Sequence, residues 1–171
     1  MLLTRIEDLS FEKVTYYSVR NQDTDEDETE FHDFLQRMSQ KPELEDELGN
    51  LFIWIEEIGR KYGAKKRYFR HEGKGGETSA LPPPKGEMVA RNIDAGYLRL
   101  YCLVANEHVV ILFNGDVKTA ATPQECPNLR SHFLNANAFA KKIDQCFRNK
   151  EITWNTDQTD IEFDSDLEIE L

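Results

Sequence analysis

Hydrophobic and polar residues alternate along this chain with two different periods. Residues 11–20 (FEKVTYYSVR) are rich in β-branched and aromatic side chains, which predicts a strand. After an acidic run, four apolar residues follow at the spacing of one helix face. They are Phe31, Phe34, Leu35 and Met38. The pattern therefore predicts an N-terminal strand followed by an amphipathic helix.

A second helical period follows the break at Lys41-Pro42. Its apolar set is Leu44, Leu48, Leu51, Phe52, Ile55, Ile58 and Tyr62. The segment is acidic at its start and basic at its end, as the helix dipole favours, and Gly63 is suited to end it. The two helices are expected to pack as a hairpin.

The strongest pattern is LRLYCLVANEHVVILFNGDVKT, residues 98–119. Leu98, Leu100, Cys102 and Val104 would face one side of a strand, and Arg99, Tyr101 and Leu103 the other. A turn at 105–107 and an apolar strand at 108–113 complete a β-hairpin. A third helix is predicted to begin near Leu129.

The segment between the helical hairpin and the β-hairpin is less regular. Residues 67–71 and 88–93 are predicted as short strands, and residues 82–84, three prolines, as a rigid extended edge. The glycines at 73–76 lack the GxxxxGK[ST] spacing of a phosphate loop, so a flexible loop is expected there. These elements indicate an α+β domain with a twisted antiparallel sheet and a helix packed on it.

Charge divides the chain into three parts. Residues 1–58 carry 5 basic and 16 acidic side chains, residues 59–150 carry 16 and 8, and residues 151–171 carry none and 8. The net charge of −11 argues against nucleic-acid binding until this basic middle is recognised. We therefore predict one domain over residues 1–150, basic over 59–150, and an acidic tail over 151–171.

The tail alternates apolar and acidic residues. Its apolar positions are Ile161, Phe163, Leu167, Ile169 and Leu171. Alternation favours strands, whereas the charge run favours a mobile, solubilising segment. As strands, the tail could lie over the basic sheet face of its own chain.

Several classes of function are disfavoured by composition. Three widely spaced cysteines do not suggest a disulfide framework or a paired CxxC zinc site, and the four histidines show no metal-ligand spacing. No cofactor motif is present. The chain also lacks a run of about 20 apolar residues and a secretory leader. We expect a cytoplasmic protein without a membrane span, metal or cofactor.

The basic middle supplies the candidate chemistry. Arg67 and Arg70 on one predicted strand, Arg99 and Tyr101 on another, and Lys118 beyond a third are placed to converge on one sheet face. Such a face suits a phosphodiester, with cations on the phosphate and aromatic rings on bases. From composition alone, the same residues are at least as compatible with a solvated outer face of an antiparallel sheet.

The chain resembles the RelE/ParE toxin superfamily over roughly residues 62–144. The resemblance lies in the order of elements and in the sequence segments RLYCL, VVILFNGDVKTA and ANAFAKKID. The HigB-like and phage-derived members are the most similar. The resemblance implies a RelE-like fold, metal-independent endoribonuclease activity on mRNA or ribosome-bound RNA, and a cognate antitoxin protein as partner.

On that resemblance, the expected catalytic residues are Arg70, His71, Arg99, Tyr101 and Lys118. Additional RNA contacts are expected from Lys65, Lys66, Arg67 and Lys85. The alternative is a non-catalytic RelE-like or phage-derived module that binds a protein partner through its sheet.

Overall fold

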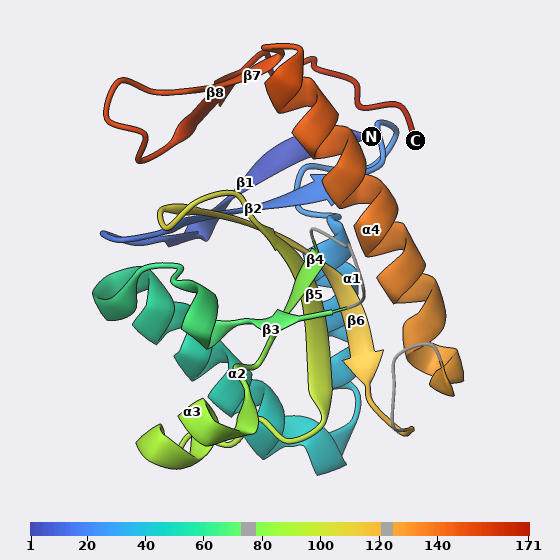
Figure 1. Ribbon diagram of the computed structural model, residues 1–171. Helices are drawn as coiled ribbons and strands as arrows, with labels where there is room; N and C mark the ends of the chain where they lie inside the picture. The colour runs from blue at the N-terminus through green and yellow to red at the C-terminus, as the bar shows by residue number, and fades with distance from the viewer. Residues whose placement is uncertain (73–77, 121–124) are drawn as a thin grey trace.

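The computed structural model describes residues 1–72, 78–120 and 125–171, and its centre is a six-stranded sheet in the order β1-β2-β6-β5-β4-β3 (Figure 1). The strands are β1 (Leu2–Ser10), β2 (Thr15–Arg20), β3 (Arg70–His71), β4 (Thr78–Leu81), β5 (Leu98–Val104) and β6 (Val109–Val117). The predicted α+β class is confirmed. The glycine-rich segment predicted as a loop, residues 73–76, lies outside the described residues.

The sheet is mixed, and the prediction of a wholly antiparallel sheet was wrong. β2 pairs with β6 in parallel, with Thr15 opposite Val109 and Ser18 opposite Leu112, whereas the other pairs are antiparallel. A parallel pair requires a long crossover, which the intervening helices and strands supply. All but the last residue of β2 are buried, as expected for a strand inside a sheet.

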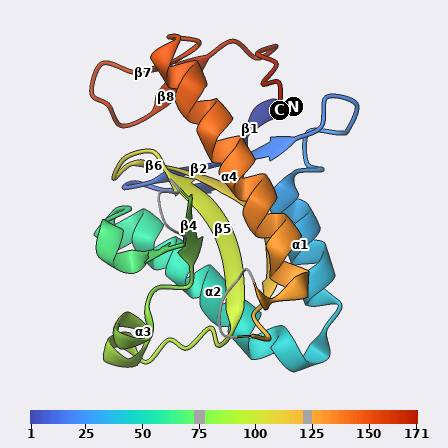
Figure 2. The same cartoon turned by 45° about the vertical axis from the view of Figure 1, so that its right-hand side comes forward.

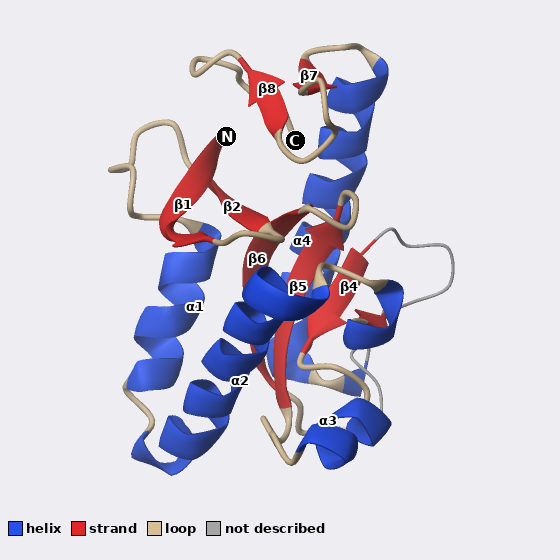
Figure 3. Cartoon of the chain, turned by 90° about the vertical axis from the view of Figure 1, so that its left-hand side faces the viewer, coloured by secondary structure: helices blue, strands red, loops and turns tan. Residues whose placement is uncertain are grey.

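Helices cover both faces of the sheet. They are α1 (Glu30–Ser39), α2 (Glu45–Glu57), α3 (Lys85–Arg91) and α4 (Pro127–Arg148). α1 and α2 form the predicted hairpin on one face, and α4 crosses the other (Figures 2 and 3). The Thr29 side chain caps α1 by accepting the His32 N–H at 3.1 Å. A π-helical turn, Ile58–Tyr62, extends α2 to Gly63, where a positive φ of 74° suits glycine.

The alternation in β5 divides its side chains between two cores, as predicted. Leu98, Leu100 and Cys102 pack towards α1 and α2, whereas Tyr101 and Leu103 pack towards α4. The return strand β6 has the same alternation and is almost fully buried. The predicted β-hairpin is therefore the centre of the fold.

Three local predictions were wrong, because turns and a helix form where extended chain was expected. Residues 88–93, predicted as a strand, lie mostly in α3, which begins after Pro84 and ends at Asn92 in the left-handed conformation (φ 52°). The three prolines connect β4 to α3 and do not form an edge strand. The strand predicted at 67–71 is shortened to β3, because a 3-10 turn, Lys66–Tyr68, precedes it.

The acidic tail is folded. It forms a short hairpin of β7 (Ile152–Trp154) and β8 (Ile161–Phe163) beside the end of α4 (Figure 1). Asp160 accepts a hydrogen bond from the Tyr17 hydroxyl at 2.7 Å and lies 3.3 Å from the Arg5 guanidinium. These contacts place the tail against β1 and β2. Among the described residues, no helix is long and apolar enough to span a membrane.

A polar network holds α1 against β6 where β2 no longer covers that strand. The Arg37 guanidinium donates to the Gly115 carbonyl at 2.8 Å and to Asn114, and also pairs with Asp33 and Asp116 at 2.9 and 3.2 Å. Burial alone raises the pKa of both aspartates. Hydrogen bonds and nearby cations outweigh that effect, so each pKa lies below its usual value.

We expect Arg37→Met to reduce the free energy of unfolding at neutral pH by about 1–3 kcal/mol, because buried acceptors lose their donor. Carboxyls with lowered pKa values stabilise the fold above their unfolded pKa and lose that contribution as the pH falls through about 4 towards the folded value. Urea unfolding of the variant should therefore show a weaker acid dependence. Arg60→Met, at an exposed i,i+4 pair with Glu56, is the control and should change little.

Candidate functional site

Arg70, Arg99 and Tyr101 lie on the same face of the sheet. In the antiparallel ladder Arg70 is opposite Ala80, and Ala80 is opposite Tyr101, so their side chains point the same way. Arg99 is two residues before Tyr101 on β5 and shares its direction. This is the face covered by α4. The convergence predicted for these three residues is therefore present.

Glu72 lies beside the basic side chains, with Arg99 as its ion-pair partner. Its Oε1 is 3.9 Å from Arg99 Nε, and Arg70 and Lys118 are close enough to influence its charge. Burial raises the pKa of Glu72, and the three cations lower it without cancelling the effect, so the carboxyl titrates above its usual range. We call Arg70, Glu72, Arg99 and Lys118 the basic cluster.

Backbone carbonyls hold the two arginines in place. Arg99 Nη1 donates to the carbonyl of Leu98 at 2.7 Å, and Arg70 Nε donates to the carbonyl of Pro82 at 3.0 Å. Arg99 is 5% exposed, whereas Arg70 and Lys118 are half-buried. Burial and the neighbouring Arg70 both lower the pKa of Arg99, while Glu72 raises it. Arg70 and Lys118 are therefore the more accessible cations of the cluster, and Arg99 is the least accessible.

Within the described residues, the basic cluster has three cations and one carboxylate. Buried cations without an equal number of anions are costly, and bound anions relieve that cost. The cluster is therefore suited to an anionic group such as a phosphate.

Tyr101 supplies a hydroxyl beside the cluster. Its side chain is fully buried, its ring centroid is 5.7 Å from that of Phe133 on α4, and its hydroxyl has no hydrogen-bond partner among the described residues. Burial, with a smaller effect from Glu72, raises its pKa far above the usual value. Tyr101 therefore keeps its proton and is a hydrogen-bond donor, not an acid.

A close approach of two strands fixes the position of Arg99. The β5–β6 register shifts between Leu100 and Cys102, and a Cβ at Gly115 would lie 1.8 Å from the Arg99 carbonyl oxygen. The Lys118 N–H continues the ladder by donating to the Tyr97 carbonyl at 2.7 Å. The absence of a side chain at Gly115 thus allows Arg99 and Lys118 to reach the same cluster.

The other predicted site residues lie elsewhere. His71 follows Arg70 on β3 and is exposed on the opposite face, so grouping it with Arg99 was wrong. Arg67 pairs with Glu87 at 2.8 Å on the α3 side. Lys65, Lys66 and Lys85 are exposed around the same side of the molecule. These residues are separate from the basic cluster.

Glu72 was missing from the predicted site. The available signal was a single carboxylate two residues after Arg70, in an otherwise basic segment. Residues i and i+2 of an extended segment lie on one side, so the position of Arg70 predicts that Glu72 lies on the same side. Among the described residues, no group of three His, Cys, Asp or Glu side chains is arranged to hold a metal.

Comparisons with protein-family models, with curated proteins and with solved structures give no match to this chain.

Proposed function

We propose that this chain is the toxin component of a toxin–antitoxin pair and acts in the cytoplasm as a metal-independent endoribonuclease on mRNA. The observation that supports this is the basic cluster, in which Glu72 lies 3.9 Å from Arg99 and is also influenced by the charges of Arg70 and Lys118. Cations stabilise the charge that develops on phosphorus oxygens during transfer, and a carboxylate accepts a proton. The resemblance to RelE-like toxins adds support of a separate kind.

In the proposed reaction Glu72 takes the proton of a ribose 2′-hydroxyl. The 2′-oxygen then attacks the adjacent phosphorus, and the bond to the 5′-oxygen of the next nucleotide breaks. The products are a 2′,3′-cyclic phosphate and a 5′-hydroxyl, whose proton comes from Lys118. The raised pKa of Glu72 suits this role, because a base is most effective when its pKa approaches the working pH.

The remaining side chains would stabilise the transition state. Arg70 and Arg99 offer guanidinium N–H groups to the non-bridging oxygens, and Tyr101 offers its otherwise unpartnered hydroxyl. When the phosphate replaces Glu72 as the partner of Arg99, the carboxylate becomes free to act on the 2′-hydroxyl. Substrate binding and activation of the base are thus linked.

The direct test is incubation of the purified protein with end-labelled single-stranded RNA, with and without EDTA. We expect fragments that end in a 2′,3′-cyclic phosphate, formed equally with the chelator, and none from the matching DNA, which has no 2′-hydroxyl. RNA that stays intact, both free and on translating ribosomes, would overturn the proposal.

Lys118→Ala should weaken RNA binding and reduce the dependence of binding on salt. Removing one phosphate contact lowers the slope of log K against log salt by about 0.7 for a single strand. Fluorescence anisotropy at several salt concentrations measures both effects. Lys141→Ala, at an exposed position on α4, is the matched control and should leave the slope unchanged.

The second candidate is a non-catalytic RelE-like module that binds a protein partner through its sheet. The near-complete burial of Arg99 and Tyr101 favours this candidate, since neither side chain is accessible to an RNA substrate from solvent. If it is correct, the protein will bind a partner but leave RNA uncut, and substitution of Glu72 will have no effect on growth.

A further inference from the structure

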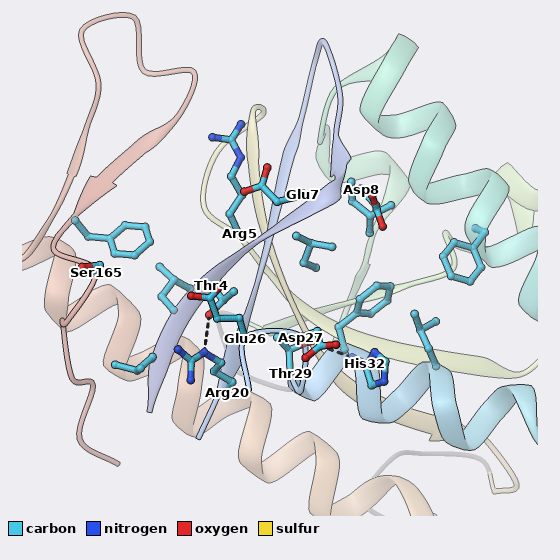
Figure 4. A pocket seen from close by; sticks show the side chains of 18 residues that line it. Thr4, Arg5, Glu7, Asp8, Arg20, Glu26, Asp27, Thr29, His32 and Ser165 are labelled. Carbon is cyan, nitrogen blue, oxygen red and sulfur yellow. Dashed lines mark hydrogen bonds between the residues drawn. The ribbon is translucent and has the colours of Figure 1, made fainter. Parts of the chain in front are cut away.

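A groove follows the outer edge strand β1, on the side of the sheet that carries α1. It has a volume of about 730 Å³ and is shown in Figure 4. Its apolar lining includes Leu2 and Ile6 of β1, Leu35 of α1 and Phe52 of α2. Phe52 is 37% exposed, and the other three are half-buried. The groove therefore exposes apolar surface beside the edge of the sheet.

The backbone of β1 is open along the groove. β1 pairs with β2 on one side. On its other side, among the described residues, the pairing is confined to the bridge from Leu2 to Glu168 and to two bonds beside it, from the Ile169 N–H to the Met1 carbonyl and from the Met1 ammonium to the Ile169 carbonyl. Beyond that point the outer N–H and C=O groups of β1 are available to another strand.

The rim of the groove is acidic. Glu7 and Asp8 on β1, and Glu26 and Asp27 before α1, are exposed and form no ion pair within the described part of the chain. The two cations of the lining are already engaged. Arg5 pairs with Asp160 at 3.3 Å. Arg20 donates to the Thr24 carbonyl at 2.7 Å and to the Thr4 hydroxyl at 3.3 Å.

We propose that this groove binds an extended segment of a partner protein in which apolar residues alternate with lysine or arginine. The segment adds a strand to the open edge of β1. Because side chains alternate along a strand, its apolar residues enter the groove and its cations meet the carboxylates of the rim.

Charge selects this occupant over a second copy of the chain. A second copy of β1 carries Glu7 and Asp8 itself, so it would add carboxylates to a rim that already has four, and like charges across neighbouring strands are destabilising. A basic segment meets opposite charge at the same positions. The inference concerns the acidic edge of the sheet and does not depend on the proposed ribonuclease activity.

The test uses two synthetic peptides as long as β1, nine residues, one alternating valine with lysine and the other valine with glutamate. Isothermal titration calorimetry with the full chain should show binding of the lysine peptide that weakens with added salt, and no binding of the glutamate peptide. Equal binding of both peptides, binding of neither, or a dimer in sedimentation that blocks the groove would overturn the proposal.

Variants locate the binding. Glu26→Gln with Asp27→Asn should weaken the lysine peptide by roughly 2- to 30-fold, the combined effect of two exposed ion pairs. The control pair, Glu43→Gln with Asp46→Asn, removes two exposed carboxylates outside the groove and should have no effect. Equal weakening by both double variants would show a general effect of charge and would contradict binding of the peptide in the groove.

Hydrogen exchange tests the added strand. The lysine peptide should slow exchange of outward-facing β1 amides, because they gain hydrogen-bond acceptors. Binding that leaves the exchange of β1 unchanged would contradict strand addition, even if the affinity were high.

Discussion

Replacing Glu72 by glutamine is expected to reduce RNA cleavage by about 100- to 10,000-fold, the usual contribution of a general base. Glutamine keeps the size of the side chain but cannot accept the 2′-hydroxyl proton. Binding of RNA should persist or strengthen, since the variant removes an anion from among three cations. Single-turnover cleavage and anisotropy on the same RNA measure the two effects separately.

The pH profile gives an independent readout. Cleavage by the wild type should rise with pH as Glu72 loses its proton, and the rise should lie above the range of an ordinary glutamate because burial raises the pKa. The variant should lack this rise. Glu107→Gln, in the exposed turn between β5 and β6, is the control. A Glu72→Gln protein that cuts RNA at the wild-type rate would remove Glu72 from the mechanism.

Gly115→Ala is expected to have the largest effect on stability, about 3 kcal/mol, at the upper end for overpacking. The new Cβ would lie 1.8 Å from the Arg99 carbonyl oxygen and 2.8 Å from its carbonyl carbon, and this contact is with backbone and not with a flexible side chain. The β5–β6 pair must separate there. Urea unfolding measures the loss, and RNA binding should fall in the fraction that remains folded.

Gly49→Ala is the matched control. Gly49 lies within α2, and apart from its chain neighbours and the backbone of its own helix no atom is within 4 Å of the position of its Cβ. Alanine is favoured over glycine in a helix interior, so this variant should gain about 0.5–1 kcal/mol. If both substitutions changed stability alike, the close approach at Gly115 would not be a real constraint on the fold.

The first two helices and the central hairpin were predictable because local pattern and tertiary packing agree there. The apolar period in α1 and α2, and the alternation in β5, gave the correct elements and the correct faces. The parallel pairing of β2 with β6 was not predictable, because no local signal in either strand specifies its partner.

Part of the site was also predictable from local pattern. Arg70, Arg99 and Tyr101 could be placed on one face by alternation, since each lies on a strand. His71 was assigned to the site wrongly because its residue type suited proton transfer. It directly follows Arg70 on β3, so its side chain points to the opposite face of the sheet. The burial of Arg99 could not be predicted from the sequence, because it depends on the packing of α4 and on the register between β5 and β6 near Gly115.

Cleavage of RNA through the 2′-hydroxyl by the basic cluster is tested most directly in cells. The wild type and the Glu72→Gln variant are induced, and RNA ends that carry a 5′-hydroxyl are mapped. We predict that such ends accumulate in mRNA with the wild type, together with growth arrest, and that both are lost with the variant. Growth arrest without new 5′-hydroxyl ends, or ends that persist in the variant, would contradict the proposed mechanism.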